Sequence, residues 1–148
     1  MPGILVGVDS SHHSERALEW AMKEAAMRRA PLTVLSVHPV ADWSGHGAIP
    51  FPGDEELVKR TKAAAQELTD KVLARLAGPH PEPVTVEAVT GIPAEELLRA
   101  AADADMIVLG ARGSGGFARL TMGSVSDQVV HHARCVVVIV PHEDRSPA

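Results

Sequence analysis

The sequence predicts a single-domain α/β fold, a doubly wound five-stranded parallel sheet with helices on both faces. Its 148 residues are close to the commonest length of one domain. Residues of the AVILMFWYC set make up 45% of the chain, enough for one sizeable core. Short runs of β-branched residues alternate with longer stretches of helical period. Runs that are apolar throughout are typical of parallel strands buried on both faces.

The first strand–helix pair is predicted from a change of period near residue 10. Ile4–Val8 is an apolar run, and a polar turn follows it. A helix is expected over residues 11–30, with Ser11 or Ser14 as its cap and Pro31 after its end. Its inner face repeats at helical spacing through Leu18, Ala21, Met22 and Ala25.

The next segments add two strands and a long helix. Leu32–Val37 is the second predicted strand and Val84–Val89 the third. Between them we expect a flexible loop over residues 41–53, which is rich in Gly and Pro. The helix that follows is ended by Gly78-Pro79. One face of this helix is expected to carry Leu57, Thr61, Ala64, Leu68, Val72 and Leu76.

The carboxyl-terminal part completes one domain with a core over residues 3–141. A short helix is predicted to start at Pro93. Two acidic residues in its first turn, Glu95 and Glu96, interact favourably with the positive end of the helix dipole. A polar tail covers residues 142–148. The remaining predicted elements are the strand Met106–Leu109, the helix Val125–His132 and the strand Val136–Val140.

Composition and charge exclude several classes of protein. There are 14 Lys+Arg against 19 Asp+Glu, a net charge of −5, and aromatic residues make up 3% with no Tyr. Both values argue against a nucleic-acid binder. Cys135 is the single cysteine, so no internal disulfide forms. No signal peptide or bilayer-spanning run is apparent, and we expect a cytoplasmic protein.

A glycine-rich segment, 109–127 (LGARGSGGFARLTMGSVSD), carries the functional prediction. It leaves a predicted strand and enters a predicted helix, where backbone N–H groups can surround an anion. Arg112 and Arg119 add positive charge, so a phosphate group is the expected ligand. The alternative is a structural loop in which Ser124 and Asp127 cap the helix. The spacing G-x2-G-x9-G-[ST] is matched by Gly110, Gly113, Gly123 and Ser124.

This motif resembles that of the universal stress protein family, and specifically its ATP-binding subgroup. VGVDSS after the first strand, TVLSV in the second and HHARCVVVIVP near the end extend the resemblance from Ile4 to Pro141. The resemblance implies strand order 3-2-1-4-5, a homodimer, and nucleotide at the carboxyl ends of strands one, two and four. The chain departs from the common pattern at residues 134–136, where a Cys-Pro step often stands in the family.

Residue roles follow from the resemblance alone. Asp9 would lie beside the adenine and ribose, Val37 beside the adenine, and Gly110 beside the ribose. The nucleotide-binding set is completed around the phosphates by Arg112, Gly113, Gly123, Ser124, Val125 and Ser126. Competing interpretations are a helix cap for Asp9, an ordinary core valine for Val37 and a solvated surface charge for Arg112.

ATP is the expected cofactor, with any Mg²⁺ carried by its phosphates. No Lys follows Lys71, so a Walker A lysine is missing, and the first turn is not GxGxxG. We therefore expect a stress-response sensor that binds ATP with little or no hydrolysis. The alternatives are an interaction domain that binds AMP, cAMP or no nucleotide, and a slow ATPase. His12 and His13 could contact phosphate when protonated, and no metal site is expected.

The last predicted strand, Val136–Val140, contains no charge or proline. In the implied order it is an edge strand, and an exposed apolar edge must be covered. Pairing with the same strand of a second copy would cover it. We therefore expect a homodimer through these five residues, with an unknown protein as a further partner.

Overall fold

The computed structural model of the chain describes residues 3–9, 12–39, 54–111 and 123–141. The predicted loop 41–53 and tail 142–148 lie outside these ranges. The strands are β1 (Ile4–Val8), β2 (Leu32–Pro39), β3 (Val84–Gly91), β4 (Met106–Gly110) and β5 (Val136–Val140). The helices are α1 (His12–Arg28), α2 (Asp54–Arg75), α3 (Pro93–Ala101) and α4 (Ser124–His132).

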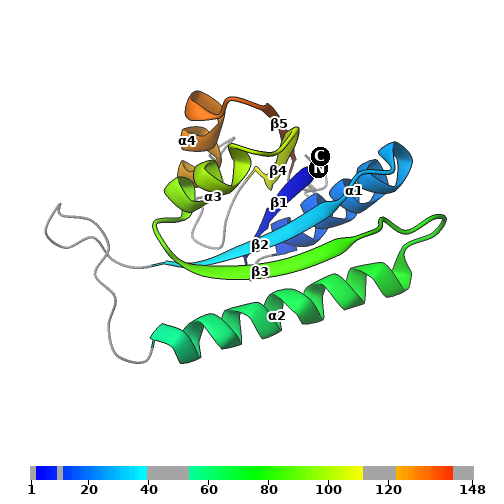
Figure 1. Cartoon of the computed structure of the whole chain (residues 1–148), viewed down its shortest axis with the longest axis horizontal. Helices are drawn as coiled ribbons and strands as arrows, with labels where there is room; N and C mark the ends of the chain where they lie inside the picture. The colour runs from blue at the N-terminus through cyan, green and yellow to red at the C-terminus, as the bar shows by residue number, and fades with distance from the viewer. Residues whose placement is uncertain (1–2, 10–11, 40–53, 112–122, 142–148) are drawn as a thin grey trace, which may run out of the picture.

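The five strands form one sheet in the order β3-β2-β1-β4-β5, and every neighbouring pair is parallel (Figure 1). From β1 the chain builds outward to β3, and it then returns to build β4 and β5 on the other side. This reversal of direction between β1 and β4 defines a doubly wound sheet. The predicted fold class and strand order are confirmed.

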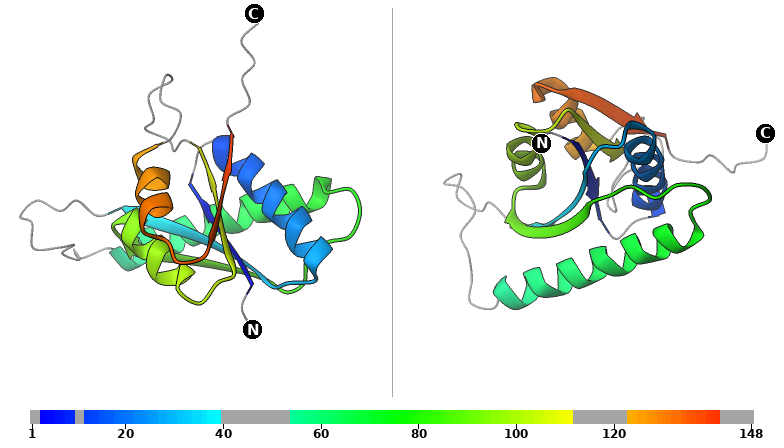
Figure 2. Two further views of the ribbon diagram at one scale, coloured as in Figure 1. Left: turned by 90° about the horizontal axis from the view of Figure 1, so that it is seen from above. Right: turned by 45° about the vertical axis from the view of Figure 1, so that its right-hand side comes forward.

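Two helices cover each face of the sheet, and each pair encloses a separate core (Figure 2). We call the core under α1 and α2 the larger cluster: Ile4, Val6, Val8, Ala17, Leu18, Ala21, Met22, Ala25, Leu32, Val34, Ala65, Val72, Leu76, Val86, Met106, Val108 and Val140. The smaller cluster, under α3 and α4, contains Leu5, Leu35, Leu97, Ala101, Ile107, Leu109 and Val129. The central strands β1 and β4 contain no polar side chain because their alternate residues enter the two clusters.

The inner face predicted for α2 is wrong in register near its amino end. Ala64 is exposed and Leu57 is 38% exposed, whereas Ala65 and Thr69 are buried. The Thr69 hydroxyl escapes the cost of burial because it donates a 2.7 Å hydrogen bond to the Ala65 carbonyl. In the second half of the helix the predicted face is confirmed, because Val72 and Leu76 are buried and Leu68 packs against the larger cluster. The inner face predicted for α1 is also confirmed.

Several predicted element ends shift by one to three residues. β2 runs on to Pro39 because β3 continues beside it, pairing His38 with Thr90 and Pro39 with Gly91. α1 ends at Arg28, and Arg29 takes a left-handed conformation with φ 55° that breaks the helix before Pro31. No helix in the described ranges is both long and apolar enough to cross a membrane.

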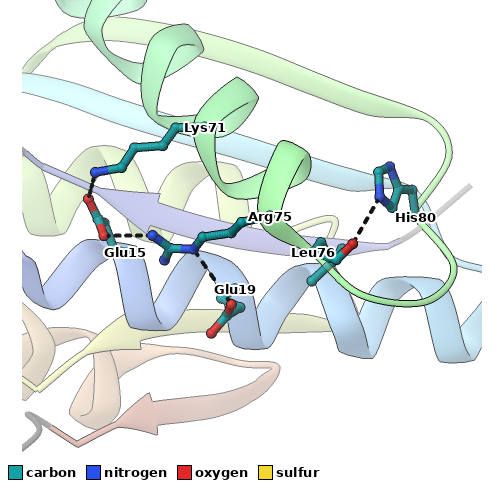
Figure 3. A network of polar contacts seen from close by, with 6 residues as sticks. All are labelled: Glu15, Glu19, Lys71, Arg75, Leu76 and His80. Carbon is teal, nitrogen blue, oxygen red and sulfur yellow. Dashed lines mark hydrogen bonds and ion pairs between the residues drawn. The ribbon is translucent and has the colours of Figure 1, made fainter.

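An ion-pair network joins α1 to α2 on the outside of the larger cluster (Figure 3). Glu15 accepts hydrogen bonds from Lys71 Nζ at 2.8 Å and from Arg75 Nη1 at 3.3 Å. Arg75 also lies 3.8 Å from Glu19. The hydrogen bond from Lys71 is the main cause that lowers the pKa of Glu15, and Arg75 adds to it. The network fixes the first turns of α1 against the second half of α2.

Candidate functional site

The carboxyl ends of β1, β2 and β4 meet at one edge of the sheet. Val8 is in register with Ser36, and β1 and β4 run together from Ile4 beside Met106 to Val6 beside Val108. The turns that leave β1 and β4 therefore lie at the same edge, on either side of the point where the strand order reverses. Ligands of open α/β sheets bind at such a point.

Asp9, at the end of β1, is held by Ser14 of α1. The Ser14 hydroxyl accepts a 2.7 Å hydrogen bond from the Asp9 backbone N–H and donates one of 2.7 Å to Asp9 Oδ1. Ser14 is buried inside the helix, so it is not the predicted helix cap. Its role is to orient the Asp9 carboxylate at the carboxyl edge. A serine five residues after a strand-end acid is the sequence signal that could have suggested this pair.

Two backbone hydrogen bonds join β5, the end of β4 and the start of α4. The Ala111 N–H donates to the Val140 carbonyl at 3.0 Å, and the Gly123 N–H donates to the Ala111 carbonyl at 2.5 Å. Gly123 and the residue after Gly110 are thus hydrogen-bonded although twelve residues separate the two glycines in the sequence. No side chain makes these bonds, so apart from the glycine spacing no residue type signals them.

At the start of α4, the first backbone N–H groups have no acceptor within the helix. Gly123 is the N-cap, and no side-chain hydrogen bond caps the helix there. The first intrahelical hydrogen bond is donated by the Asp127 N–H to the Gly123 carbonyl, at 3.0 Å. The N–H groups of Ser124, Val125 and Ser126 consequently have no acceptor within the helix. Ser124 is exposed and is the first helical residue, so the alternative in which it caps the helix is wrong.

Ser126 differs from Ser124 because its side chain is buried. Its hydroxyl lies 3.1 Å from the Gly123 carbonyl and 3.3 Å from the Ala111 carbonyl, and the residue is 2% exposed. The side chain therefore holds the first turn of α4 against the end of β4. A direct contact of this hydroxyl with phosphate stays a prediction.

At the end of β2, Val37 packs its partly buried side chain against the smaller cluster. This agrees with the interpretation of Val37 as a core valine, and it leaves open the predicted role of its backbone beside a base. The neighbouring side chains of Ser36 and His38 point to the opposite face, because side chains alternate along a strand. Ser36 is buried and His38 is half-buried.

Several predicted site residues lie outside the described residues. They are Arg112, Gly113 and Arg119 of the glycine-rich segment. His12 and His13 form the first positions of α1, but the structure does not describe their side chains. The predictions for these five residues stay predictions.

The start of α4 offers backbone donors of the kind that bind anions, whereas the chemistry of a thiol or a bound metal has no support among the described residues. Burial raises the pKa of the half-buried Cys135 thiol, which disfavours the reactive thiolate. No group of three or more His, Cys, Asp or Glu side chains in the described ranges could hold a metal ion. The N–H groups at the start of α4 and the Asp9 carboxylate, oriented by Ser14, are polar groups that the described part of the chain offers at this edge.

Comparison with known proteins identifies relatives along nearly the whole chain. The model described as the universal stress protein family matches residues 2–141. A universal stress protein of Mycolicibacterium smegmatis is 36% identical over 148 residues, which cover 97% of this chain and 49% of that protein. One of Thermus aquaticus is 36% identical over 140 residues, covering 93% and 96%. The chain spans about half the length of the mycobacterial relatives it matches.

Solved structures share the fold. Universal stress protein UspA from Lactobacillus plantarum is 31% identical with a TM-score of 0.71, covering 94% of this chain and 97% of that chain. A universal stress protein solved in complex with cAMP is 24% identical with a TM-score of 0.66, covering 95% and 96%. One from Archaeoglobus fulgidus in complex with dAMP is 23% identical with a TM-score of 0.60, covering 94% and 97%. From the family model and these relatives, the chain belongs to the universal stress protein family.

Proposed function

We propose that this chain binds ATP at the carboxyl edge of its sheet and acts as a nucleotide-dependent regulatory module in a stress response. The observation that carries the proposal is the start of α4, where three successive N–H groups have no acceptor in the helix and no side chain caps them. Such a helix start favours phosphate. Structural relatives in complex with cAMP and dAMP support an adenine nucleotide as the ligand.

In this proposal the nucleotide lies along the edge from α4 toward β2. The backbone N–H groups of residues 124–126, together with Arg112 and Gly113, bind the phosphates. Gly110 has no side chain to block the ribose, and Asp9, oriented by Ser14, accepts a ribose hydroxyl. The backbone of Val37 contacts the base.

Hydrolysis is expected to be slow or absent. No Lys follows Lys71 in the sequence, so no lysine stands in the Walker A position before Ser124. The Asp9 carboxylate at the end of β1 already accepts the Ser14 hydroxyl through its Oδ1. Any Mg²⁺ would be held chiefly by the phosphates, because the described residues offer no acidic cluster for it.

A charge placed at the start of α4 tests the proposal. Ser124→Glu should keep the helix stable, because an acidic side chain in the first turn interacts favourably with the helix dipole. The added carboxylate, however, repels phosphate. Calorimetry should show ATP affinity at least ten-fold weaker, with a smaller loss for AMP. Gln128→Glu adds the same charge to an exposed position one turn later and should leave ATP affinity within two-fold.

Three results would count against the proposal. Unchanged ATP affinity in Ser124→Glu would remove the phosphate site from α4. Tighter binding of AMP or cAMP than of ATP to the unmodified chain would favour the alternative ligand. Rapid release of inorganic phosphate from ATP would make the chain an ATPase.

We further propose that two copies pair through β5. In the sheet formed by the described residues β5 pairs with β4 alone, and Val136 at its start is 58% exposed. Light scattering at micromolar concentration should give twice the mass of one chain. Val136→Lys should give the mass of a single chain, because a charged lysine blocks an edge. Thr85→Lys, exposed on the opposite edge strand β3, should stay dimeric. A single-chain mass for the unmodified protein would end this proposal.

A further inference from the structure

One hydroxyl in the core lacks a hydrogen bond. Among the side-chain nitrogen and oxygen atoms that are fully buried in the described residues, Thr90 Oγ1 is the one without a partner. Buried hydroxyls are nearly always paired, and an unpaired one destabilises the fold. Thr90 as a whole is only partly buried, so other atoms of the same residue are exposed while its hydroxyl is enclosed.

Thr90 stands at the carboxyl end of β3, beside the end of β2. It is in register with His38, and the two side chains share a face of the sheet because paired residues of parallel strands point the same way. Two residues earlier on that face of β2 is the buried Ser36. Further toward the strand starts, the same face is apolar, with Val34 and Val86 in the larger cluster. Polar side chains are therefore confined to the ligand-binding edge.

Among the residues that the structure describes, α2 is the element that follows this polar corner, and its first half packs loosely. α2 leaves the carboxyl end of β2 and returns to the start of β3, so its amino-terminal half lies over the carboxyl ends of these strands (Figure 1). Between residues 55 and 64 of α2 no residue is buried, and Ala65 is the first that is. The second half of α2, in contrast, is anchored by Thr69, Val72 and Leu76. Within the described ranges, the buried stripe of α2 therefore begins at Ala65 and does not include its first turns.

We propose that Thr90, with His38 beside it, forms the base-recognition end of the nucleotide site. This inference rests on the proposed function, which places the base at the end of β2. β3 lies one strand spacing further, about 4.8 Å away, so Thr90 is within reach of a polar edge of the base. The hydroxyl both donates and accepts, as the ring nitrogens and amino group of a purine require. Its missing partner is supplied by the ligand.

Thr90→Val tests this, because it removes the hydroxyl and keeps the shape and strand preference of the side chain. The nucleotide-free variant should be more stable, with a higher urea midpoint, since an unpaired buried hydroxyl is gone. Its ATP affinity should fall about five-fold, the effect of one neutral hydrogen bond. Its affinity for inorganic tripolyphosphate, which has no base, should not change. Thr90→Ser keeps the hydroxyl and should bind ATP within two-fold of the unmodified chain.

Thr85→Val is the matched control, because Thr85 is exposed on the same strand and points to the other face. It should alter neither ATP nor tripolyphosphate affinity. The inference is overturned if Thr90→Val binds ATP normally, if it loses ATP and tripolyphosphate equally, or if its urea midpoint falls. If the unmodified chain binds tripolyphosphate and ATP equally well, base recognition fails while the phosphate site stands. If it binds neither, the proposed function fails with it.

Discussion

The two faces of the sheet are built differently. α1 and α2, of 17 and 22 residues, enclose the larger cluster, and an ion-pair network joins them on the outside. α3 and α4 have 9 residues each and enclose the smaller cluster. The start of α4, where the phosphate site is proposed, belongs to the thinner face. Most of the buried apolar residues therefore lie on the face covered by α1 and α2, while the face covered by α3 and α4 positions the backbone N–H donors.

Removing one leucine from each face gives the largest expected effect. Leu18→Ala, in the larger cluster, should lower the free energy of unfolding by about 4 kcal/mol, within the range of about 2–5 for such changes. Leu97→Ala should lower it by about 2–3 kcal/mol, since the short α3 can move to fill the space. Leu18 is fully buried and Leu97 is 5% exposed. Urea denaturation of both variants measures the comparison, and equal losses would contradict it.

A smaller effect is expected from adding a methyl group at Gly7, which lies in β1 under the smaller cluster. The new Cβ would lie 2.7 Å from Leu109 Cδ2 and 2.9 Å from Leu97 Cδ2. Gly7→Ala should cost about 1–3 kcal/mol, toward the lower figure because terminal methyl groups can rotate away.

Combining Gly7→Ala with Leu97→Ala sharpens the comparison. The added methyl group then occupies part of the space left by the leucine, so the double variant should lose less stability than the sum of the two single variants. A strictly additive loss in urea denaturation would show that the two sites do not share one packed space.

The smallest effect is expected on the outside of the larger cluster. Glu15→Gln should cost less than about 1 kcal/mol at neutral pH and low salt, because the ion pairs are partly exposed. Lys71 and Arg75 lower the pKa of Glu15 in the folded chain. The stabilisation is therefore complete above the ordinary pKa of glutamate and is lost as pH falls through the lowered folded value.

Thermal unfolding of Glu15→Gln and the unmodified chain should converge at acid pH and in high salt. Glu67→Gln, an exposed position on α2, serves as the control and should have no pH-dependent effect of this kind. A difference that persists below the folded pKa of Glu15 would mean that packing, rather than charge, causes it.

The fold could be predicted because apolar runs and helical spacing are local properties of the sequence. The face that the first half of α2 turns toward the sheet could not be predicted. Its first turns contain no buried residue, so apolar residues there do not indicate which face packs inward. At the candidate site, the glycine spacing indicated where Gly110 and Gly123 would meet. The pairing of Asp9 with Ser14 and the unpaired hydroxyl of Thr90 depend on side-chain geometry in three dimensions, which no spacing encodes.

Ala111 bonds to β5 through its N–H and to the N-cap of α4 through its carbonyl. A single residue, Ala111, therefore links the proposed dimer strand β5 to the proposed phosphate site through main-chain hydrogen bonds. A shift of β5 on meeting a second copy would be transmitted directly to the first turn of α4. Since neither bond uses a side chain, exchanging the buried Ala111 for glycine would leave this mechanical link intact, whereas inserting a residue beside it would uncouple the two.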